Sequence, residues 1–478
     1  MLAQKICASG HELLALPEAG ISASAQAASD LPHAAWLPGG QAQDAAACLA
    51  ILAGKPKADW IIVDHYALDY RWQSAMRTAG RRIMAIDDLA DRRHDCDILL
   101  DQNLVPGAHD RYHDLVPPHC DTLLGPHYAL LREEFSSDSA GVCRNVKEPR
   151  LLVMFGGADA QNLTLRTVKA LAAIQWQGAV DVVAGPLYRP IEMLRTALAM
   201  LPGATLHSPA ENVAALMRSA SLAVGAPGIA SWERCACELP TISIAQANNQ
   251  VLIGSALADA GASLHLGHAD ALDEGILAAA LRVMLSNAGM RTAMSRTAAS
   301  ICDGRGLRRV LSRLFPDEVA IRRAQAADAR LLLAWRNDER TRRHSHTSSP
   351  LRIEEHLDWF ERTLARVDVD LLVACCGDVP VACVRFDIDG ARARVSIYID
   401  PDLQGQGVGL SALRMALAWL LSARPGIHTT DADVLSENLA SHRLFAAAGY
   451  RLAWSRYERV QDASPIDFAI LQGKETKS

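Results

Sequence analysis

The residues whose types and spacing best fit a chemical task form a glycine-rich turn near the C-terminal end of the chain. They follow an apolar run at 393–400 and precede a long stretch of helical periodicity: Gln404, Gly405, Gln406, Gly407, Val408 and Gly409. Glycines allow a backbone to approach a phosphate closely, and the unpaired N–H groups at a helix start can then hold it. The order strand, turn, helix therefore predicts a phosphate-binding turn, and a plain tight turn is the alternative.

Two more glycine turns follow apolar runs in the middle of the chain, at 150–157 and 221–228. The candidate ligand-binding residues there are Gly156, Gly157, Asp159, Asn162, Ser231 and Glu233. Two glycine turns that each lead into a helix suit a nucleoside diphosphate, and Glu233 could accept hydrogen bonds from ribose hydroxyls. An acid in the first turn of a helix is also favoured by the helix dipole, and the two roles are compatible.

Candidate catalytic residues lie at the end of an apolar run in the first part of the chain. The runs at 60–66, 81–88 and 97–103 each end in acids or amides, as parallel strands do when their carboxyl ends face a ligand crevice. His65 and Tyr66 belong to the first of these ends, and a histidine there could act as a general base. The alternative for His65 is a hydrogen-bonded histidine that only stabilises the strand end.

Alternating strands and helices must position these residues. Residues 1–135 and 150–300 alternate between apolar runs and helical stretches, which predicts two open α/β domains with a ligand cleft between them. The first twenty residues predict a helix end, a turn at Ser9–Gly10 and a short strand, and the polar segment 132–149 is typical of a linker. Residues 318–465 have one strand, two helices, a hairpin and another strand before the glycine turn, which predicts an α+β domain.

Composition and charge exclude several classes of protein. The chain has 478 residues, enough for about three domains, and its net charge of -6 gives no reason to expect nucleic acid. No stretch reaches the roughly 18 apolar residues of a membrane span, and the start lacks the pattern of a signal peptide, so we expect a cytoplasmic protein. The 11 cysteines include no CxxC pair, which favours buried thiols over disulfides or metal ligands. We therefore expect no metal.

The α+β domain resembles the GNAT acetyltransferases over 318–460. Their (Q/R)-x-x-G-x-(G/A) loop binds the pyrophosphate of acetyl-CoA, and Gln404, Gly407 and Gly409 match it. The stretch SENLASHRLFAAAGYRL resembles the second family signature, which implies that Asn438 lies near the pantetheine arm. The resemblance implies acetyl-CoA as the co-substrate.

The proton donor of this domain has several candidates. Phe445 stands where many GNAT enzymes have a tyrosine that protonates the leaving thiolate of CoA. Because phenylalanine cannot donate a proton, the acid must be Tyr450, Ser441 or water. The alternative for Tyr450 is simple core packing.

The front of the same domain, LLLAWRNDERTRRHS, resembles a GNAT subgroup that acts on amino sugars, including sugar nucleotides. The resemblance implies substrate contacts by Arg336, Asn337 and Asp338. The alternative is that these three residues form a solvated helix end.

The first two domains resemble the UDP-sugar hydrolases of pseudaminic acid biosynthesis, which share the GT-B architecture of nucleotide-sugar glycosyltransferases. The resemblance rests on motifs in the same order: DWIIVDHY, RRIMAIDDLADRRHDCDILLDQNL, LLGPHYALLREEF, FGGADAQN and SWERCACELP. It implies metal-free hydrolysis of UDP-2,4-diacetamido-2,4,6-trideoxy-β-L-altropyranose, with Tyr66 near the sugar. It also implies that Asn249 and Gln250, which stand where relatives often have Asp-Asn-Gln, belong to the UDP site. The family's N-terminal G-T-G-H loop, whose histidine is central to the reaction, has no counterpart, so we expect the first Rossmann-type domain to lack its first strand, loop and helix.

Three functions fit these observations. The first is a bifunctional enzyme that N-acetylates the 4-amino UDP-sugar and then hydrolyses the product to release UDP. The second is an active acetyltransferase whose GT-B-like pair of Rossmann-type domains binds the nucleotide sugar without hydrolysing it. The third is a GT-B glycosyltransferase. The expected partners are therefore a UDP-sugar and acetyl-CoA, and the oligomeric state is open.

Overall fold

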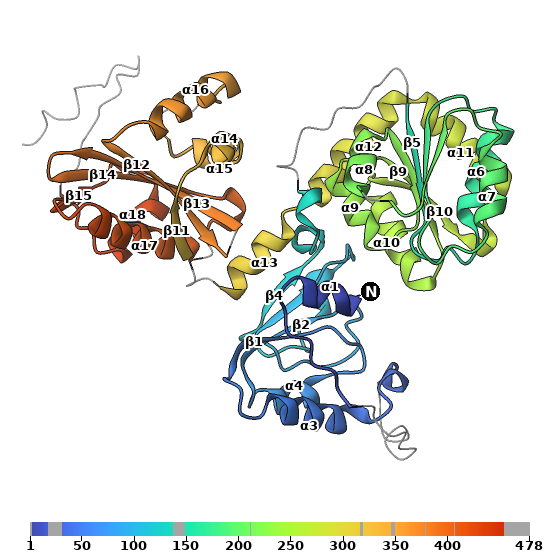
Figure 1. Cartoon of the computed structure of the whole chain (residues 1–478), viewed down its shortest axis with the longest axis horizontal. Helices are drawn as coiled ribbons and strands as arrows, with labels where there is room; N and C mark the ends of the chain where they lie inside the picture. Colours follow the sequence, from blue (N-terminus) through green and yellow to red (C-terminus); the bar gives the residue numbers. More distant parts are fainter. Residues whose placement is uncertain are drawn as a thin grey trace, which may run out of the picture. The chain divides into compact units, whose positions relative to one another are not determined.

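The computed structural model describes residues 2–17, 31–136, 149–210, 212–315, 319–345, 349–377, 379–405 and 407–453. The chain divides into two compact units, one of Met1–Glu318 with Cys376–Val381 and one of Val319–Cys375 with Ala382–Ser478. Among the described residues, the first unit contains two separate parallel sheets, and the second is built on one mixed sheet (Figure 1).

The first sheet has four parallel strands in the order β1-β2-β3-β4. They are β1 (Ala58–Val63), β2 (Gly80–Ile86), β3 (Ile98–Asp101) and β4 (Asp121–Leu124). The helical segments in this part of the chain are α1 (Leu2–Ala8), η1 (Ala34–Trp36), α3 (Gly40–Leu52), α4 (Tyr70–Met76), α5 (Ala108–Arg111), η2 (Pro126–Tyr128) and η3 (Glu133–Phe135). Side chains of a strand alternate between its faces, so Ile83 and Ala85 pack with α3 and α4, and Met84 packs on the opposite face.

That opposite face is covered by a helix from much later in the sequence. Helix α13 (Gly306–Leu314) places Leu314 in one buried cluster with Met84 and Leu123. The indole N–H of Trp60 also donates to the carbonyl of Leu314 at 2.8 Å. The core of the first sheet is therefore completed by residues that follow the second sheet in the sequence.

The start of the chain differs from the prediction. Helix α1 forms, but residues 11–17 contain no strand. The exposed apolar side chains of this segment are Leu13, Leu14 and Leu16. Three leucines in a short run have the composition of a strand, but a strand needs a hydrogen-bonded neighbour, and the segment pairs with no strand among the described residues. Its polar contact is an ion pair between Glu12 and Lys55 at 2.7 Å.

The second sheet has six parallel strands in the order β10-β9-β8-β5-β6-β7. They are β5 (Leu151–Met154), β6 (Val180–Val183), β7 (Ala204–His207), β8 (Leu222–Gly225), β9 (Thr241–Ala245) and β10 (Ser263–His268). The helices are α6 (Leu163–Ala173), α7 (Ile191–Leu198), α8 (Val213–Ser219), α9 (Ala230–Ala236), α10 (Asn248–Asp259), η4 (Ala269–Ala271), α11 (Glu274–Ser286) and α12 (Ala288–Ile301). From β5 the sheet continues in chain order to β6 and β7 on one side, and from β8 to β9 and β10 on the other. This is the doubly wound, Rossmann-type arrangement.

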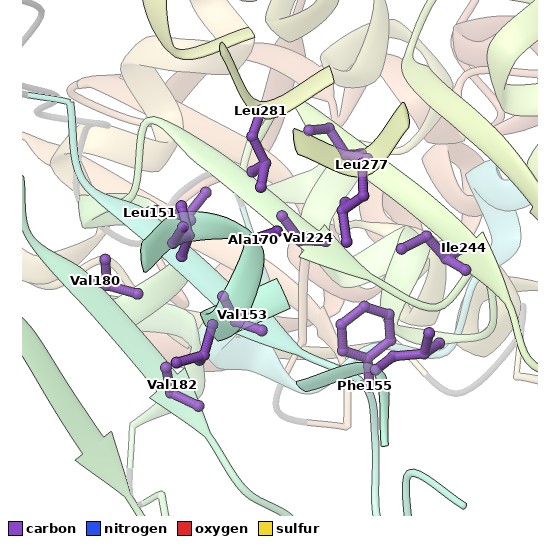
Figure 2. Close-up of a cluster of buried hydrophobic side chains, with 14 of the residues drawn as sticks. Leu151, Val153, Phe155, Ala170, Val180, Val182, Val224, Ile244, Leu277 and Leu281 are labelled. Carbon is purple, nitrogen blue, oxygen red and sulfur yellow. The ribbon is translucent and has the colours of Figure 1, made fainter. Parts of the chain in front are cut away.

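Helices cover both faces of the second sheet. Leu151 of β5 points into a core with Leu277 and Leu281 of α11 (Figure 2). Leu152, the next residue, belongs to the core on the other face, where it joins Trp232 of α9. Strands buried on both faces appear in the sequence as continuous apolar runs, and the strands predicted at 150–157 and 221–228 are confirmed for that reason.

The beginning of the predicted linker is part of the second core. Phe135 is fully buried and Leu131 is nearly so, and both pack in the cluster that contains Trp232. The interpretation of 132–136 as linker was therefore wrong, because Phe135, within this polar run, is buried in the core. Residues 137–148 lie outside the described part of the chain.

The second unit is an α+β sandwich around a five-stranded sheet in the order β11-β12-β13-β14-β15. The strands are β11 (Val319–Arg323), β12 (Val369–Cys376), β13 (Val379–Asp389), β14 (Arg392–Ile399) and β15 (Thr429–Asp431). The helical segments are η5 (Ala326–Asp328), α14 (Ala329–Asn337), α15 (Glu339–Arg342), α16 (Ile353–Leu364), η6 (Pro401–Leu403), α17 (Val408–Ala423) and α18 (Leu439–Ala447). Leu372 packs with α17 and α18, and its neighbours Leu371 and Val373 pack with α14 and α16 on the other face.

Two expectations about whole-chain properties can be compared with this fold. No helix in the described ranges combines the length and apolar character needed to cross a membrane. The cysteines predicted as buried thiols, Cys235, Cys237, Cys375 and Cys376, are buried and form no disulfide among the described residues, which confirms that interpretation.

Candidate functional site

The predicted ligand-binding turns of the second sheet start at the same edge. β5 and β8 are direct neighbours, with Met154 opposite Gly225, and the order of the strands reverses between them. In doubly wound sheets, ligands bind in the crevice at the carboxyl ends of the strands at this reversal. The turns before α6 and α9 both leave the sheet there.

The turn before α6 is held by its own polar side chains. Both carboxylate oxygens of Asp159 accept from the start of the helix, from the N–H groups of Leu163 at 2.9 Å and Thr164 at 2.8 Å. Asn162 accepts from the hydroxyl of Tyr188. The side chains of Asp159 and Asn162 therefore shape the turn. Gly156 and Gly157 are exposed, so the turn offers its backbone to a ligand.

An amide connects this turn with the one after β9. The side chain of Gln246 donates to Asp159 at 2.9 Å, and its backbone N–H donates to the side chain of Gln250 at 2.8 Å. Asn249 is exposed. The turns after β5 and β9 are thus joined by one polar network, which contains the predicted residues Asp159 and Gln250.

The turn before α9 carries two further predicted residues. Ser231 is buried, and its hydroxyl accepts from Arg234 at 3.0 Å. Glu233 is partly buried, and burial raises the pKa of its carboxyl although Arg132 and Arg234 oppose this. The guanidinium of Arg132 lies 3.9 Å from that carboxylate, and its own side chain is 64% exposed. The Glu233 side chain itself is 20% exposed, so only a small part of it reaches the surface of this edge.

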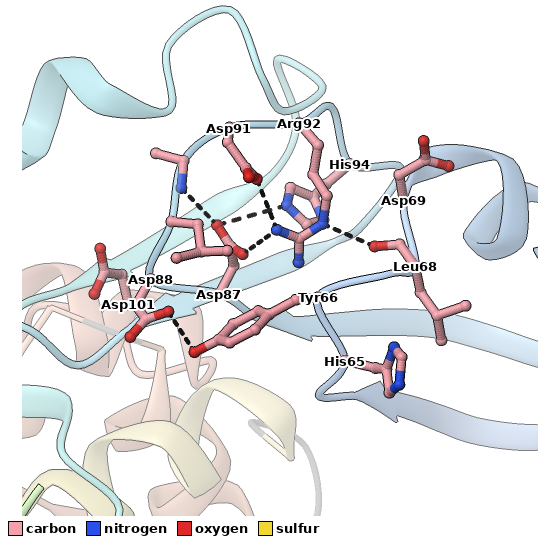
Figure 3. Close-up of polar contacts among 12 residues, drawn as sticks. His65, Tyr66, Leu68, Asp69, Asp87, Asp88, Asp91, Arg92, His94 and Asp101 are labelled. Carbon is pink, nitrogen blue, oxygen red and sulfur yellow. Dashed lines mark hydrogen bonds and ion pairs between the residues drawn. The ribbon is translucent and has the colours of Figure 1, made fainter. Parts of the chain in front are cut away.

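At the first sheet, Tyr66 lies at the end of β1 with its hydroxyl bound to a carboxylate (Figure 3). It donates to Asp88 at 2.7 Å, and Asp88 also accepts from the side chain of Asn103 at 2.9 Å. The ring lies beside His33 and Trp36, at centroid distances of 5.4 and 5.7 Å. Burial and the bond to Asp88 raise the pKa of Tyr66, so the phenol stays protonated. Its free lone pairs can accept a hydrogen bond from a ligand hydroxyl or amide.

His65 makes a hydrogen bond to the backbone just after β1, as expected for the alternative in which it only stabilises the strand end. Its Nδ1 accepts a hydrogen bond from the backbone N–H of Ala67 at 3.1 Å. The neutral ring must then carry its proton on Nε2. As folded, His65 therefore has no nitrogen free to take a proton from water.

A buried charge cluster supports the loop behind Tyr66. Asp87 forms an ion pair with Arg92 at 2.6 Å, and His94 Nε2 lies 3.8 Å from the same carboxylate (Figure 3). Arg92 also donates to the carbonyl of Leu68 at 2.9 Å, which connects the ends of β1 and β2. Burial acts to raise the pKa of Asp87, but His94 and Arg92 outweigh it and the pKa is lowered. In contrast, burial raises the pKa of Asp101 to about 6.

In the second unit, the glycine turn directly precedes α17. Gly407 is the residue before the helix and has φ +84°, a conformation that other residues rarely adopt. A Cβ on Gly409 would lie 2.4 Å from Cδ1 of Ile399, so this glycine lets the helix approach β14. Val408 is fully buried, and Gln404 and Gly405 are exposed. Gln406 lies outside the described residues.

β14 and β15 pair along only part of their length. They are parallel over three residue pairs and end at Arg394 opposite Asp431, whereas β14 continues to Ile399. Beyond Arg394, the edge of β14 makes no ladder with any described strand on that side. The last residues of β14, just before the glycine turn, therefore have an edge that pairs with no described strand on that side.

The comparison with known families identifies this part of the chain. Residues 318–451 match the family described as "Acetyltransferase (GNAT) domain". They form a GNAT acetyltransferase domain. Acetyl-CoA as its co-substrate is confirmed with that assignment.

The chain is also similar to several individual proteins. An uncharacterized protein of Methanocaldococcus jannaschii is 22% identical over 411 residues, 83% of this chain and 82% of that protein. The UDP-2,4-diacetamido-2,4,6-trideoxy-β-L-altropyranose hydrolase of Campylobacter jejuni is 33% identical over 121 residues, 25% of this chain and 43% of the relative. The spore coat polysaccharide biosynthesis protein SpsG of Bacillus subtilis is 26% identical over 204 residues, 41% of this chain and 58% of the relative.

The chain thus spans 43% and 58% of the lengths of the latter two relatives. An aminoglycoside acetyltransferase solved with coenzyme A is 18% identical, with a TM-score of 0.26, over 28% of this chain and 84% of that one. Homology to a UDP-sugar hydrolase and to SpsG, followed by a GNAT domain, confirms the predicted fusion, and the paired Rossmann-type sheets agree with a GT-B-like architecture.

The candidate acid of the GNAT domain lies in its core. Tyr450 packs edge-on against Phe445, with the ring centroids 5.1 Å apart. Burial raises the pKa of Tyr450, so it holds its proton at neutral pH. Asn438 caps α18 by accepting from the N–H of Ser441 at 3.0 Å. The side-chain oxygen of Asn438 is therefore used by the helix, and its amide N–H groups are the part that a ligand can use.

The predicted sugar-contacting residues of the GNAT domain have structural partners. Both ends of the Asn337 amide bond to the backbone of Leu351, at 2.8 and 2.9 Å. Asp338 caps α15 by accepting from the N–H of Arg340 at 2.9 Å. Burial lowers the pKa of Arg336. Asn337 and Asp338 thus hold the backbone on both sides of α15. They are not simply solvated residues at a helix end, which was the alternative.

The edge of the second sheet where the strand order reverses, between β5 and β8, is called the switch-point edge. Sequence reasoning missed three of its residues, Arg132, Arg234 and Gln246. Arg234 had a detectable signal, because a charged residue within the apolar run around Cys235 and Cys237 must be buried with the helix. Arg132 was hidden in the supposed linker. No cluster of three or more metal-ligating side chains occurs within the ranges that the structure describes.

Proposed function

We propose that the chain carries out two consecutive steps on one UDP-linked sugar. The GNAT domain transfers an acetyl group from acetyl-CoA to the 4-amino group. The first unit then hydrolyses the product, UDP-2,4-diacetamido-2,4,6-trideoxy-β-L-altropyranose, and releases UDP. The observation that carries the proposal is the presence, in one chain, of a Rossmann-type switch-point edge with the predicted UDP residues and of a GNAT domain.

In this proposal, residues of the second unit bind acetyl-CoA and supply the proton for acetyl transfer. The pyrophosphate of acetyl-CoA would bind the exposed backbone at Gly405 and Gly407, and the free edge of β14 would hydrogen-bond the thioester arm. The amine attacks the thioester carbon, and the thiolate of CoA leaves as the tetrahedral intermediate collapses. Tyr450, which keeps its proton, would protonate that thiolate, and solvent would take the proton that the amine loses and return one to Tyr450.

UDP binding would use the edge at β5 and β8. The backbone at Gly156 and Gly157 would face the diphosphate, and Glu233 would accept hydrogen bonds from the ribose hydroxyls. In the first lobe, Tyr66 would accept a hydrogen bond from the sugar while its own proton stays on the bond to Asp88. Water would attack the anomeric carbon as the bond to the diphosphate oxygen breaks and UDP leaves, and the proton of the water would pass to solvent.

A specific observation favours a second candidate, in which the first unit binds the UDP-sugar without hydrolysing it. The Nδ1 of His65 is occupied by the N–H of Ala67, and the remaining Nε2 carries the proton. The predicted base therefore does not have a free lone pair. The chain would then act as an acetyltransferase with an attached nucleotide-sugar binding module.

One experiment separates the two candidates. The purified full chain is incubated with the 4-amino UDP-sugar and acetyl-CoA, and free CoA and free UDP are measured over time. The bifunctional proposal expects CoA release followed by UDP release in equal amounts. CoA release without UDP release would establish the second candidate, and UDP binding without any CoA release would contradict both.

A further inference from the structure

A buried guanidinium lies inside the turn that joins β8 to α9. Arg234 is 3% exposed, and its side chain points back toward the start of its helix, as helical side chains do. Its Nη2 donates to the carbonyl of Ala226 at 2.8 Å and to the hydroxyl of Ser231 at 3.0 Å. The guanidinium therefore connects the beginning of the turn with the first turn of α9.

The other two nitrogens of this guanidinium are unused. Nε and Nη1 of Arg234 are buried and have no hydrogen-bond partner among the described residues. A Cβ on Gly225 would lie 2.9 Å from Nη1, so this nitrogen sits directly under the end of β8. Burial lowers the pKa of Arg234 to about 10, and the group keeps its charge at neutral pH. A buried charge without bonded counter-charge is unfavourable, so an anion bound beside it gains free energy.

The turn needs such a charge if it is to hold a diphosphate. Helix α9 has only seven residues, which limits the dipole of its N-terminus. Pro227 lies within the turn and has no N–H to donate. The backbone alone is therefore a weak anion site, and the guanidinium supplies the positive charge that the backbone lacks.

We propose that Arg234 is a positioning residue for the diphosphate: its fixed charge and its bonds to Ala226 and Ser231 make the β8–α9 turn prefer a nucleoside diphosphate over the uncharged nucleoside. This inference rests on the proposed function, because the turn belongs to the edge assigned there to UDP. It adds the source of the preference for the diphosphate. A role in folding alone would stabilise the turn but leave that preference unchanged.

The test compares the affinities of UDP, uridine and inorganic pyrophosphate by calorimetry on the full chain. Substituting Arg234→Gln is expected to raise the Kd of UDP about tenfold and to weaken pyrophosphate equally, while the Kd of uridine changes less than about twofold. Equal weakening of UDP and uridine, or no change in either, would overturn the inference.

Arg291→Gln is the matched control. Arg291 is also a buried arginine of the second lobe, but it donates to the carbonyls of Met284 and Leu285 at 2.6 and 2.8 Å at the end of α11. This variant is expected to lower the melting temperature without changing the ratio of the UDP and uridine affinities. A changed ratio would show that loss of any buried arginine has the same effect, and the inference would fall.

Two further outcomes are distinguishable. If Arg234→Gln does not fold, Arg234→Lys keeps the charge on a shorter side chain that does not fill the guanidinium site, and it should weaken UDP about threefold with uridine unchanged. A lysine variant that weakens both ligands alike would contradict the inference. If the unsubstituted chain binds neither UDP nor pyrophosphate, the UDP-binding part of the proposed function fails and this inference fails with it. If it binds UDP and the glutamine variant binds equally well, the inference alone fails.

Discussion

At the scale of single residues, the protonation step of acetyl transfer depends on Tyr450. Substituting Tyr450→Phe removes one hydroxyl and retains the ring that packs on Phe445. If this hydroxyl protonates the thiolate, kcat should fall about 100-fold and the KM for acetyl-CoA should stay constant, because general acids contribute at least that much. Stopped assays of CoA release measure both constants. An unchanged kcat would mean that water is the acid and that Tyr450 only packs.

Asp87 gives a second prediction, on stability and its pH dependence. The folded pKa of this carboxyl is lowered by His94 and Arg92 against the effect of burial. Its contribution to stability is therefore complete above the unfolded value of about 3.9 and is lost as the pH falls below it. Asp87→Asn removes the fully buried partner of Arg92 and leaves that guanidinium with Asp91, at 3.0 Å, as its carboxylate. The substitution should therefore lower the free energy of unfolding by about 1.5–3 kcal/mol at neutral pH.

Urea unfolding of both proteins at several pH values measures this effect. The difference between Asp87→Asn and the unsubstituted chain should shrink at acid pH, because protonated Asp87 is also neutral. The exposed Asp114 is the control, and Asp114→Asn should change the free energy of unfolding by less than about 0.5 kcal/mol. A difference for Asp87→Asn that is constant with pH would contradict the assigned ion pair.

The sequence predicted which residue types gather at the sites better than it predicted their tasks. Strand ends with acids and amides were recognised from the apolar runs before them. Whether Asp159 faces a ligand or caps its own helix depends on the local φ of +43°, which no spacing in the sequence reveals. The same holds for His65, because its bond to Ala67 is set by the turn after β1. Arg132 was missed because its anchor, Phe135, is an isolated apolar residue in a polar run.

At the scale of elements, the contact between α17 and β14 is set by one glycine. A methyl group on Gly409 would lie 2.4 Å from Cδ1 of Ile399. Gly409→Ala should therefore lower the free energy of unfolding by about 1–3 kcal/mol and weaken acetyl-CoA binding. Adding Ile399→Val removes Cδ1 and should restore both. Chemical denaturation and calorimetry of the single and double variants measure this, and failure of the second substitution to restore stability would place the conflict elsewhere.

The glycine turn itself can be tested with a matched pair. Gly407 and Gly390 both have positive φ, +84° and +57°, and both face open space. Aspartate at either position costs about 1–2 kcal/mol of backbone strain. Only Gly407→Asp should also weaken acetyl-CoA binding, by about tenfold or more, because it places a carboxylate where the pyrophosphate would bind. Equal affinities of the two variants would exclude this turn as the phosphate site.

Strands could be predicted from the sequence where burial on both faces produces a long continuous run of apolar residues. The central strands β5, β8 and β9 were found as continuous apolar runs. β4, β7 and β15 were not, because they are short edge strands with polar residues, and their formation depends on a neighbour already in place. The strand expected within 11–17 is the opposite case, an apolar run without a partner among the described strands.

At the scale of the whole molecule, the two compact units should respond separately to ligands. Calorimetric scans of the full chain should show two unfolding transitions, because each unit has its own cores. Acetyl-CoA should raise the temperature of one transition and UDP that of the other. At a concentration about 100 times its Kd, each ligand should add about 2.7 kcal/mol to the free energy of unfolding of its unit. A single transition that both ligands raise would contradict the independence of the units.

Helix α13 has a consequence for synthesis of the chain on the ribosome. The strands of the first sheet emerge first, but the face around Met84 and Leu123 stays uncovered until Leu314 has left the exit tunnel. The second sheet lies between them in the sequence and can complete its own core earlier. Of the two lobes of the first unit, the one whose strands are synthesised first is therefore completed second, and until then its uncovered apolar face is open to chaperones or to aggregation.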